Sequence, residues 1–154
     1  MFFDILKFRH NSQPKDLGFE KFYIYPDIAN RIKNTKDLQE AVNYKNNQSL
    51  IILNDYAIDD GALKLIGEKA KACFLIDLSR IIRSRGMRRV IELSRLRNFL
   101  IFCKKYKVKF TFASFATEEQ ALRTARELIH VGLILDLNLE EVKNALKLVS
   151  DYLG

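Results

Sequence analysis

Short apolar runs alternate with amphipathic stretches along the chain. Five of these runs are rich in Phe, Ile and Tyr and have the length of β-strands. They cover residues 2–8, 21–25, 50–54, 73–77 and 108–114. The runs LIILN and CFLID are apolar at nearly every position instead of alternating with polar residues, which predicts strands that are buried on both faces.

Four helices are predicted from recognisable start signals. They are expected at residues 36–44, 61–72, 121–132 and 142–153. Two of the start signals are capping boxes, Thr117 with Gln120 and Asn138 with Glu141, in which the two residues bond each other's backbone N–H groups. The start signals of the other two helices are Asn34 or Thr35 and Asp59 or Asp60.

The alternation of strands and helices predicts a single α/β domain over residues 1–154, with mostly parallel strands that are each covered by the helix that follows. Five strands are too few for a standard eight-stranded barrel, which takes roughly 200 residues or more. Two arrangements therefore stay open at this point. One is an open, doubly wound sheet, and the other is a barrel that lacks some of its units.

Composition narrows the class of protein. Cys73 and Cys103 lie far apart and form no Cys-x-x-Cys motif, so neither a disulfide framework nor a zinc site is indicated. No apolar run approaches the roughly 18 residues of a membrane span, and the first ten residues lack the features of a secretory signal. We therefore expect a soluble, cytoplasmic protein with no membrane partner.

The net charge of +7 is concentrated in one segment. Residues 80–109 hold eleven of the 26 Lys and Arg residues but only Glu92 among the 19 acids, and the remainder of the chain holds 15 bases and 18 acids. Seven arginines and no lysine lie between Ser79 and Arg97. Because guanidinium presents a planar fork that matches phosphate oxygens, this cluster favours contact with a nucleic-acid backbone over a merely solvated helix face.

Within the basic segment, Gly86 is expected to separate two helical pieces, because glycine weakens a helix interior. After it, an apolar stripe with helical spacing is expected to face the core; its members are Val90, Leu93, Leu96, Leu100 and Cys103. Arg88 and Arg95 fall on the opposite side, where Glu92 could pair with Arg88. Arg89 would point toward the stripe, so either the first turn is irregular or Arg89 reaches a buried acceptor.

A catalytic alternative rests on acids near the predicted strand ends. Asp4, Asp27, Asp55 and Asp77, with Ser114 in the fifth strand, stand where α/β enzymes often carry their chemistry, so a metal-dependent phosphoesterase is the second hypothesis. The same carboxylates also suit simple helix caps. A third hypothesis is a generic basic α/β module that binds DNA or a membrane surface. The sequence shows no glycine-rich phosphate loop and no Gly-x-Ser-x-Gly motif.

The run LIDLSRIIRSRGMRRVIELSRLRNFLIFCKKYKVKFTFASFATEEQALRTAREL, residues 75–128, resembles protein component 3 of ribonuclease P, the 30-kilodalton subunit family of archaea and eukaryotes. The segment LSRLRNFLIFCKKYKVKF matches the family's basic helix, and residues 17–25 look like its second-strand region. The segment ASFAT has Phe115 where the family has glycine, and LRTAREL has Ala125 in place of proline.

The resemblance implies a reduced (β/α) barrel of the TIM type found in polymerase and histidinol-phosphatase-like phosphoesterases, shorter than in other family members and without their histidine metal ligands. It also implies a noncatalytic subunit, with no cofactor in this chain, of an enzyme whose RNA cleaves precursor tRNA with magnesium. The implied partners are the ribonuclease P RNA, protein component 2 and the other protein components. The expected RNA-binding residues are Arg80, Arg83, Arg85, Arg88, Arg89, Arg95, Arg97, Lys104, Lys105, Arg123 and Arg126.

Overall fold

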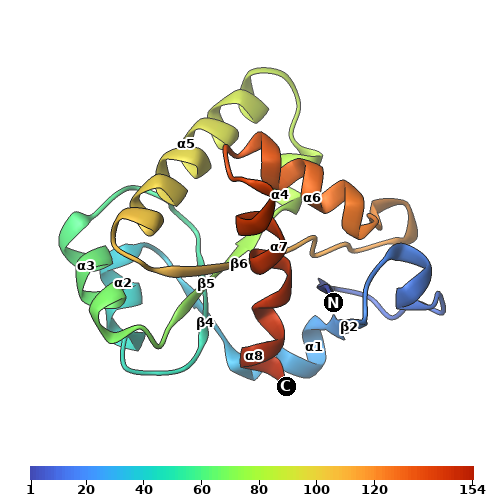
Figure 1. The fold of residues 1–154 in the computed structure, drawn as a ribbon, viewed down its shortest axis with the longest axis horizontal. Coiled ribbons are helices and arrows are strands. Elements are labelled where there is room, and N and C mark those ends of the chain that lie inside the picture. Colours follow the sequence, from blue (N-terminus) through green and yellow to red (C-terminus); the bar gives the residue numbers. More distant parts are fainter.

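A computed structural model describes residues 1–154 and shows an α/β fold with a central group of parallel strands (Figure 1). The strands are β1 (Phe3–Leu6), β2 (Lys21–Ile24), β3 (Ile32–Thr35), β4 (Leu50–Leu53), β5 (Cys73–Asp77) and β6 (Lys109–Ala113). Five of them fall inside the predicted runs. The sixth, β3, was not predicted, because its sequence IKNT is largely polar, as suits a strand at the edge of a sheet.

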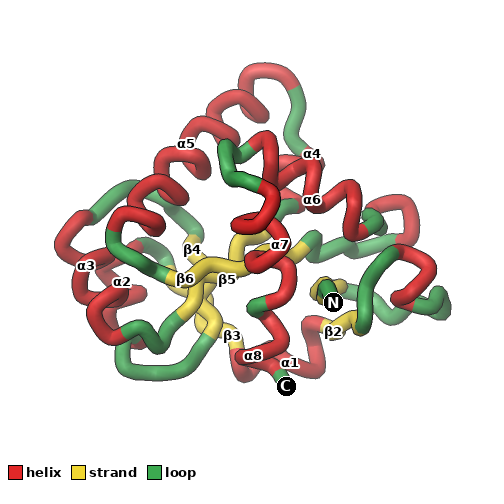
Figure 2. Tube along the Cα trace, viewed as in Figure 1, coloured by secondary structure: helices red, strands yellow, loops and turns green.

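The helices surround the strands and connect them in chain order (Figure 2). The α-helices are α1 (Tyr25–Ile28), α2 (Leu38–Ala41), α3 (Asp60–Lys69), α4 (Ser79–Arg83), α5 (Gly86–Lys105), α6 (Ala125–Ile134), α7 (Leu139–Lys147) and α8 (Val149–Leu153). Short 3-10 turns are η1 (Pro14–Leu17), η2 (Ala29–Arg31), η3 (Val42–Tyr44) and η4 (Glu119–Ala121). None of the helices has both the length and the apolar character needed to cross a membrane.

The strands form two parallel sheets that meet at one seam. One sheet has the order β3-β4-β5-β6 and the other pairs β1 with β2. Leu6 and Ala116 form an isolated parallel bridge, and the N–H of Phe115 donates to the carbonyl of Ile5 at 3.0 Å, so β1 adjoins the end of β6. No ladder joins β2 to β3. The strands therefore follow one another in chain order around an incomplete circle, which is a partial, barrel-like arrangement.

Both faces of the four-stranded sheet are buried, which confirms the prediction from the continuous apolar runs. Ile51, Phe74 and Phe112 point to one face and pack with α2, α3 and α5 in the larger hydrophobic cluster. Leu50 and Leu75 point to the other face and pack with β1, β2, α1 and α8 in a second cluster. Parallel sheets are usually covered on both faces in this way, because their crossover connections return over the sheet.

Some of the predicted N-terminal caps of the helices are correct and others are not. The capping box of Asn138 and Glu141 is confirmed, with N–H to oxygen distances of 2.8 and 2.9 Å, and so is Asp59 as the cap of α3. The box predicted at Thr117 is wrong, because Thr124 and Glu127 carry the same pattern and cap α6. The expectation of Asn34 or Thr35 as a cap is also wrong. Asp37 caps α2, and both predicted residues lie in β3.

The break at Gly86 is confirmed, since α4 ends at Arg83 and Gly86 begins α5 with a left-handed φ of 56°. The predicted apolar stripe holds for Leu96, Leu100 and Cys103, which are buried. It is wrong for Val90, which is 59% exposed. The first turns of α5 extend beyond the strands (Figure 1), so Val90 is left uncovered, although the same part of the helix contacts α4.

Candidate nucleic-acid interface

The arginine-rich segment lies at the carboxyl edge of the sheet. Since β4, β5 and β6 are parallel, the chain leaves all three strands at the same edge. Helix α4 begins two residues after β5, and the first turns of α5 return past that edge. The segment after β6, residues 114–124, lies opposite α4. Ligand sites of open α/β sheets usually occur at this edge, where loops from neighbouring strands converge.

Several arginines at this edge are exposed and have no acidic partner. Arg85, Arg88 and Arg95 are exposed and make no hydrogen bond or ion pair within the chain. Arg83 is also exposed, and its Nη2 donates to the hydroxyl oxygen of Thr117 at 2.5 Å. Arg126, in the first turn of α6, is exposed as well. We call the first four the free arginine surface, because their guanidinium donors face solvent or a neutral hydroxyl.

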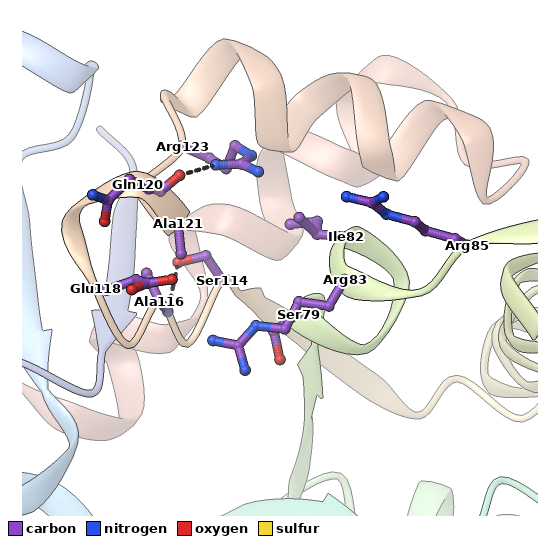
Figure 3. Close-up of a pocket in the computed structure, with 10 residues that line it drawn as sticks. All are labelled: Ser79, Ile82, Arg83, Arg85, Ser114, Ala116, Glu118, Gln120, Ala121 and Arg123. Carbon is purple, nitrogen blue, oxygen red and sulfur yellow. Dashed lines mark hydrogen bonds between the residues drawn. The ribbon is translucent and has the colours of Figure 1, made fainter.

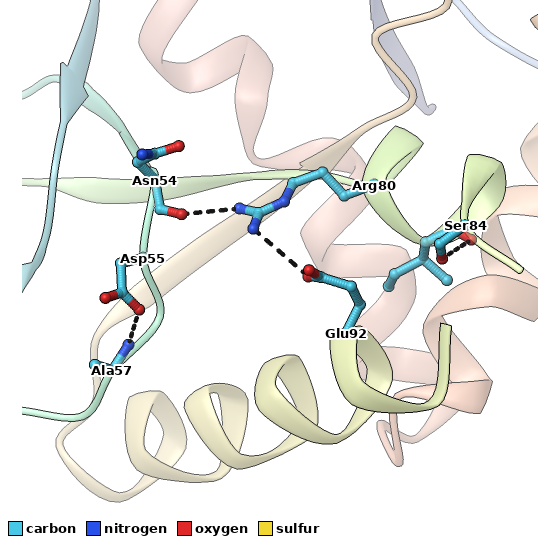
Figure 4. Close-up of polar contacts among 7 residues, drawn as sticks. Asn54, Asp55, Ala57, Arg80, Ser84 and Glu92 are labelled. Carbon is cyan, nitrogen blue, oxygen red and sulfur yellow. Dashed lines mark hydrogen bonds and ion pairs between the residues drawn. The ribbon is translucent and has the colours of Figure 1, made fainter. Parts of the chain in front are cut away.

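Arg80 is held in place by contacts with its surroundings (Figure 4). Its guanidinium lies 3.5 Å from the Glu92 carboxylate, donates to the carbonyl oxygen of Asn54 at 3.4 Å, and sits 5.3 Å above the centre of the Tyr56 ring. The predicted pairing of Glu92 with Arg88 is therefore wrong. Helix α4 packs against the start of α5, so Arg80 of α4 reaches the half-buried Glu92 in place of Arg88, which lies one turn before Glu92 in α5.

Other cations of the segment bind parts of the protein. Arg89 donates from Nε to the carbonyl of Ile81 at 3.2 Å and from Nη2 to that of Ile82 at 3.0 Å, so it joins α5 to the end of α4. Of the two alternatives for Arg89, the structure shows that it reaches acceptors, but they are part-buried and exposed backbone carbonyls and not a buried group. This use of two donors leaves Arg89 fewer N–H groups for an external ligand than an unbound guanidinium has.

The far half of α5 places two of its cations beside one acid in the connection between α6 and α7 and one acid in α7. Arg97 donates to the carbonyl of Ile134 at 2.8 Å and lies 3.6 Å from the Asp136 carboxylate. Lys104 lies 3.3 Å from the Glu141 carboxylate. The predicted RNA-binding set therefore divides by structure into cations that the chain already engages and cations that it leaves open.

Two further cations of the predicted set stand apart. Arg123 is half-buried, and its Nη1 donates to the carbonyls of Gln120 and Leu122. Lys105 is exposed at the end of α5, with its ammonium 5.6 and 5.2 Å from the ring centres of Phe102 and Tyr106. The half-buried rings of Phe102 and Tyr106 thus lie against this lysine.

Hollows along the carboxyl edge are lined mainly by polar and basic side chains. Arg80 lines three of them, with Arg88 in two and Arg95 in one. A fourth hollow, shown in Figure 3, lies between α4 and the segment after β6 and is lined by Arg83, Arg85 and Arg123 among others. Arginines from α4, from α5 and from the loop before α6 thus line a series of hollows at one edge of the sheet.

The acids at the strand ends are each held by a local partner. Asp27 pairs with Arg9 at 2.8 Å, Asp55 accepts the N–H of Ala57, and Asp77 accepts both the N–H and the hydroxyl of Ser79. Three or more His, Cys, Asp or Glu side chains do not gather anywhere in the chain in an arrangement that could hold a metal ion. The arginine lining of the hollows at this edge suits anions.

Asp4 is the one buried carboxylate of this group, with 1% of its surface exposed. Burial raises its pKa from 3.8 to about 6, although hydrogen bonds from the Ser114 hydroxyl, the Ser114 N–H and the Ile5 N–H act in the opposite direction. The two Ser114 bonds, of 2.6 and 2.7 Å, tie β1 to the end of β6. Asp4 therefore fastens the seam from which residues 114–124 extend.

Sequence inspection missed residues of the edge that carry no charge. Asn54 supplies a carbonyl to Arg80, and Thr117 accepts from Arg83, yet neither belongs to a recognisable motif. The one feature that could have indicated Asn54 is its position directly after a strand, which was the feature used to select the acids at the strand ends. Nothing in the sequence pairs Thr117 with Arg83, since 34 residues separate them and only the pairing of β5 with β6 brings them together.

Fold and surface together define a parallel α/β protein with a basic carboxyl edge. Its overall fold is similar to that of a chain in the cryo-EM structure of archaeal ribonuclease P with mature tRNA, with a TM-score of 0.64 over 93% of this chain and 77% of that chain, at 13% sequence identity. No protein-family model matches the sequence, and no curated protein matches it. The likeness to the archaeal chain is one of fold.

Proposed function

We propose that this chain is a cytoplasmic RNA-binding subunit of ribonuclease P, of the protein component 3 type, which supports maturation of tRNA 5′ ends by stabilising the catalytic RNA. The observation that carries the proposal is the free arginine surface, since Arg85, Arg88 and Arg95 are exposed and unpaired at one edge of the sheet. The fold likeness to a chain of archaeal ribonuclease P supports the choice of RNA as the polyanion.

The arginines would act by neutralising phosphates where RNA strands come close together. Each guanidinium offers five N–H donors in a fixed plane and can hold two phosphate oxygens at once. Such contacts position the RNA backbone without reading its sequence. In this proposal the RNA, with its magnesium ions, carries out the cleavage, and this chain contributes charge and shape.

Further protein subunits, among them component 2, are the proposed protein partners. Strands β2 and β3 each have one paired neighbour, so the circle of strands has two free edges. Unpaired strand edges are commonly covered by another element or another chain. In this proposal the fold is a reduced barrel of the type found in polymerase and histidinol-phosphatase-like phosphoesterases. The partner subunits would then cover its two open edges.

Reconstitution tests the proposal directly. Precursor tRNA cleavage is measured for the catalytic RNA with the other protein subunits, with and without this chain, at a fixed magnesium concentration. We expect the complete mixture to cleave faster, and the chain alone with magnesium to leave the precursor intact. Cleavage by the chain alone would favour the phosphoesterase hypothesis, and equal rates with and without the chain would contradict the proposed role.

A further inference from the structure

One hollow of the carboxyl edge is lined by three arginines that come from three segments of the chain. It has a volume of about 280 Å³ and lies between α4 and the segment that follows β6 (Figure 3). Arg83 comes from the end of α4, Arg85 from the link to α5, and Arg123 from the loop before α6. These three guanidinium groups lie around one cavity, although up to 40 residues separate them in the sequence.

The other walls of the hollow are partly apolar and partly rigid. Ser114 and Ala116 are almost fully buried and belong to the seam that Asp4 fastens. Ile82 and Ala121 add an apolar lining. A group that enters this hollow therefore meets a fixed floor and a short apolar wall beside the arginines.

The arginines of the hollow keep donors that the protein does not use. Arg85 makes no contact with an acceptor of the chain. Arg83 gives one Nη2 bond to Thr117, and Arg123 uses only Nη1, for two carbonyls. Because each guanidinium has five N–H groups, all three retain donors for an anion.

Charge indicates which anion suits the hollow. Three arginines and the single acid Glu118 leave an excess of two positive charges among the lining residues. A phosphate monoester carries about −1.5 to −2 at pH 7 and exposes three acceptor oxygens. An internal phosphodiester of an RNA chain carries one negative charge and is flanked by a nucleotide on both sides, so it matches the excess charge and the closed floor less well.

We propose that this hollow binds a terminal phosphate monoester of an RNA chain, with the attached ribose against Ile82 and Ala121. The inference rests on the proposed function in taking RNA as the ligand. It adds a preference for the phosphorylated end of the strand over the backbone in general. Arg85 is the main ligand of the phosphate, and Arg83 and Arg123 hold it from the two sides.

The test compares one short oligoribonucleotide in three forms, with a 5′-phosphate, with a 3′-phosphate, and with hydroxyl groups at both ends. Binding of each form to the full chain is measured by fluorescence anisotropy at one ionic strength. We expect one or both phosphorylated forms to bind about tenfold more tightly than the hydroxyl form, as an added charge-assisted contact predicts. The form that is preferred identifies the end that enters the hollow.

Two variants separate the hollow from the rest of the surface. Arg85→Gln should abolish the preference and leave the melting temperature unchanged, because Arg85 has no partner in the fold. Arg88→Gln is the matched control, since Arg88 lies at the same edge but outside this hollow. It should weaken all three forms by a similar factor and keep the preference.

The outcomes distinguish this inference from the proposed function. Equal binding of all three forms would overturn the terminal-phosphate site while leaving RNA binding itself established. A preference that survives in Arg85→Gln would also overturn it. If none of the three forms binds, both the proposed RNA-binding role and this inference are contradicted.

Discussion

The two halves of α5 use the same residue types for different purposes. The first half, residues 86–95, is exposed at most positions, including the apolar Met87 and Val90, and its Arg88 and Arg95 have no partner in the chain. The second half, residues 96–105, buries Leu96, Phe99, Leu100 and Cys103. Its Arg97 and Lys104 lie beside Asp136 and Glu141.

The difference shows that the position of a cation relative to the acids of other helices, and not its residue type, decides whether it is available to a ligand. Acids between α6 and α7 and in α7 face the second half of α5, whereas Glu92, the acid of the first half, is engaged by Arg80 of α4. A basic helix is thus anchored at one end and open at the other.

The largest effect is expected from the anchored half. Phe99 is fully buried between Phe74 and Tyr56, so Phe99→Ala should lower the free energy of unfolding by about 3 to 5 kcal/mol. Val90→Ala, in the exposed half, is the control and should change it by less than about 0.5 kcal/mol. Chemical denaturation measures both. Similar values for the two variants would contradict the division of α5 into two halves.

Asp4 is a buried carboxylate without a cation beside it, in contrast to Asp136 and Glu141, which lie beside cations of α5. The pKa of Asp4 is raised from 3.8 to about 6, so its protonated form is favoured in the folded state. The contribution of Asp4 to the free energy of unfolding is therefore greatest below about pH 4. It falls by about 3 kcal/mol as the pH rises through 6. Asp4→Asn should remove this part of the pH dependence. Parallel stability profiles of the two proteins between pH 4 and 7 would contradict the expectation.

The open half should carry RNA affinity. Replacing both Arg88 and Arg95 by Ala should weaken RNA binding about 30-fold, if each charged contact contributes about 1 kcal/mol. Unfolding stability should change little, because neither side chain has a partner in the fold. The matched control replaces Arg97 and Lys104 by Ala and should weaken binding far less. Equal losses in the two double variants would show that pairing within the chain does not decide availability.

Salt dependence gives an independent measure of the same contacts. The logarithm of the binding constant for folded RNA should fall linearly with the logarithm of salt concentration. Loss of two phosphate contacts in the Arg88 and Arg95 double variant should reduce the slope by about 1.4 to 1.8. Titrations at several salt concentrations measure this difference. An unchanged slope would mean that these arginines do not touch phosphate.

The smallest effect is expected from a single ion pair of the anchored half. Lys104 lies 3.3 Å from Glu141, and both side chains are partly exposed. Lys104→Ala should lower the free energy of unfolding by about 0.2 to 1 kcal/mol, because solvent screens such pairs. The loss should shrink at high salt. A loss above 2 kcal/mol would indicate that this pair contributes more to anchoring α5 than its exposure suggests.

Much of the local structure could be predicted from the sequence. The apolar runs at 50–54 and 73–77 lie in β4 and β5, the capping box of Asn138 begins α7, and Gly86 separates α4 from α5. Each of these features depends on residues close together in the chain, through burial, side-chain capping or backbone freedom. The concentration of positive charge in residues 80–109 could also be read from the sequence, and its role in binding a polyanion stays a prediction.

Contacts between distant segments could not be predicted. The pairing of Glu92 with Arg80 depends on how α4 packs against α5, and the exposure of Val90 depends on where the sheet ends beneath the helix. The prediction of Thr117 as a cap was wrong for the same reason, because Thr117 and Thr124 both fit the local pattern and the connection after β6 selects Thr124.

The amino-acid sequence by itself determined the α/β character of this protein, the burial of its central strands and the concentration of arginine in one segment. Tertiary structure alone decided which arginines are free, and it formed the hollow of Arg83, Arg85 and Arg123 at the edge of the sheet. The reason is physical. Apolar pattern and charge are properties of neighbouring residues, whereas the availability of a charge depends on what the rest of the fold places beside it.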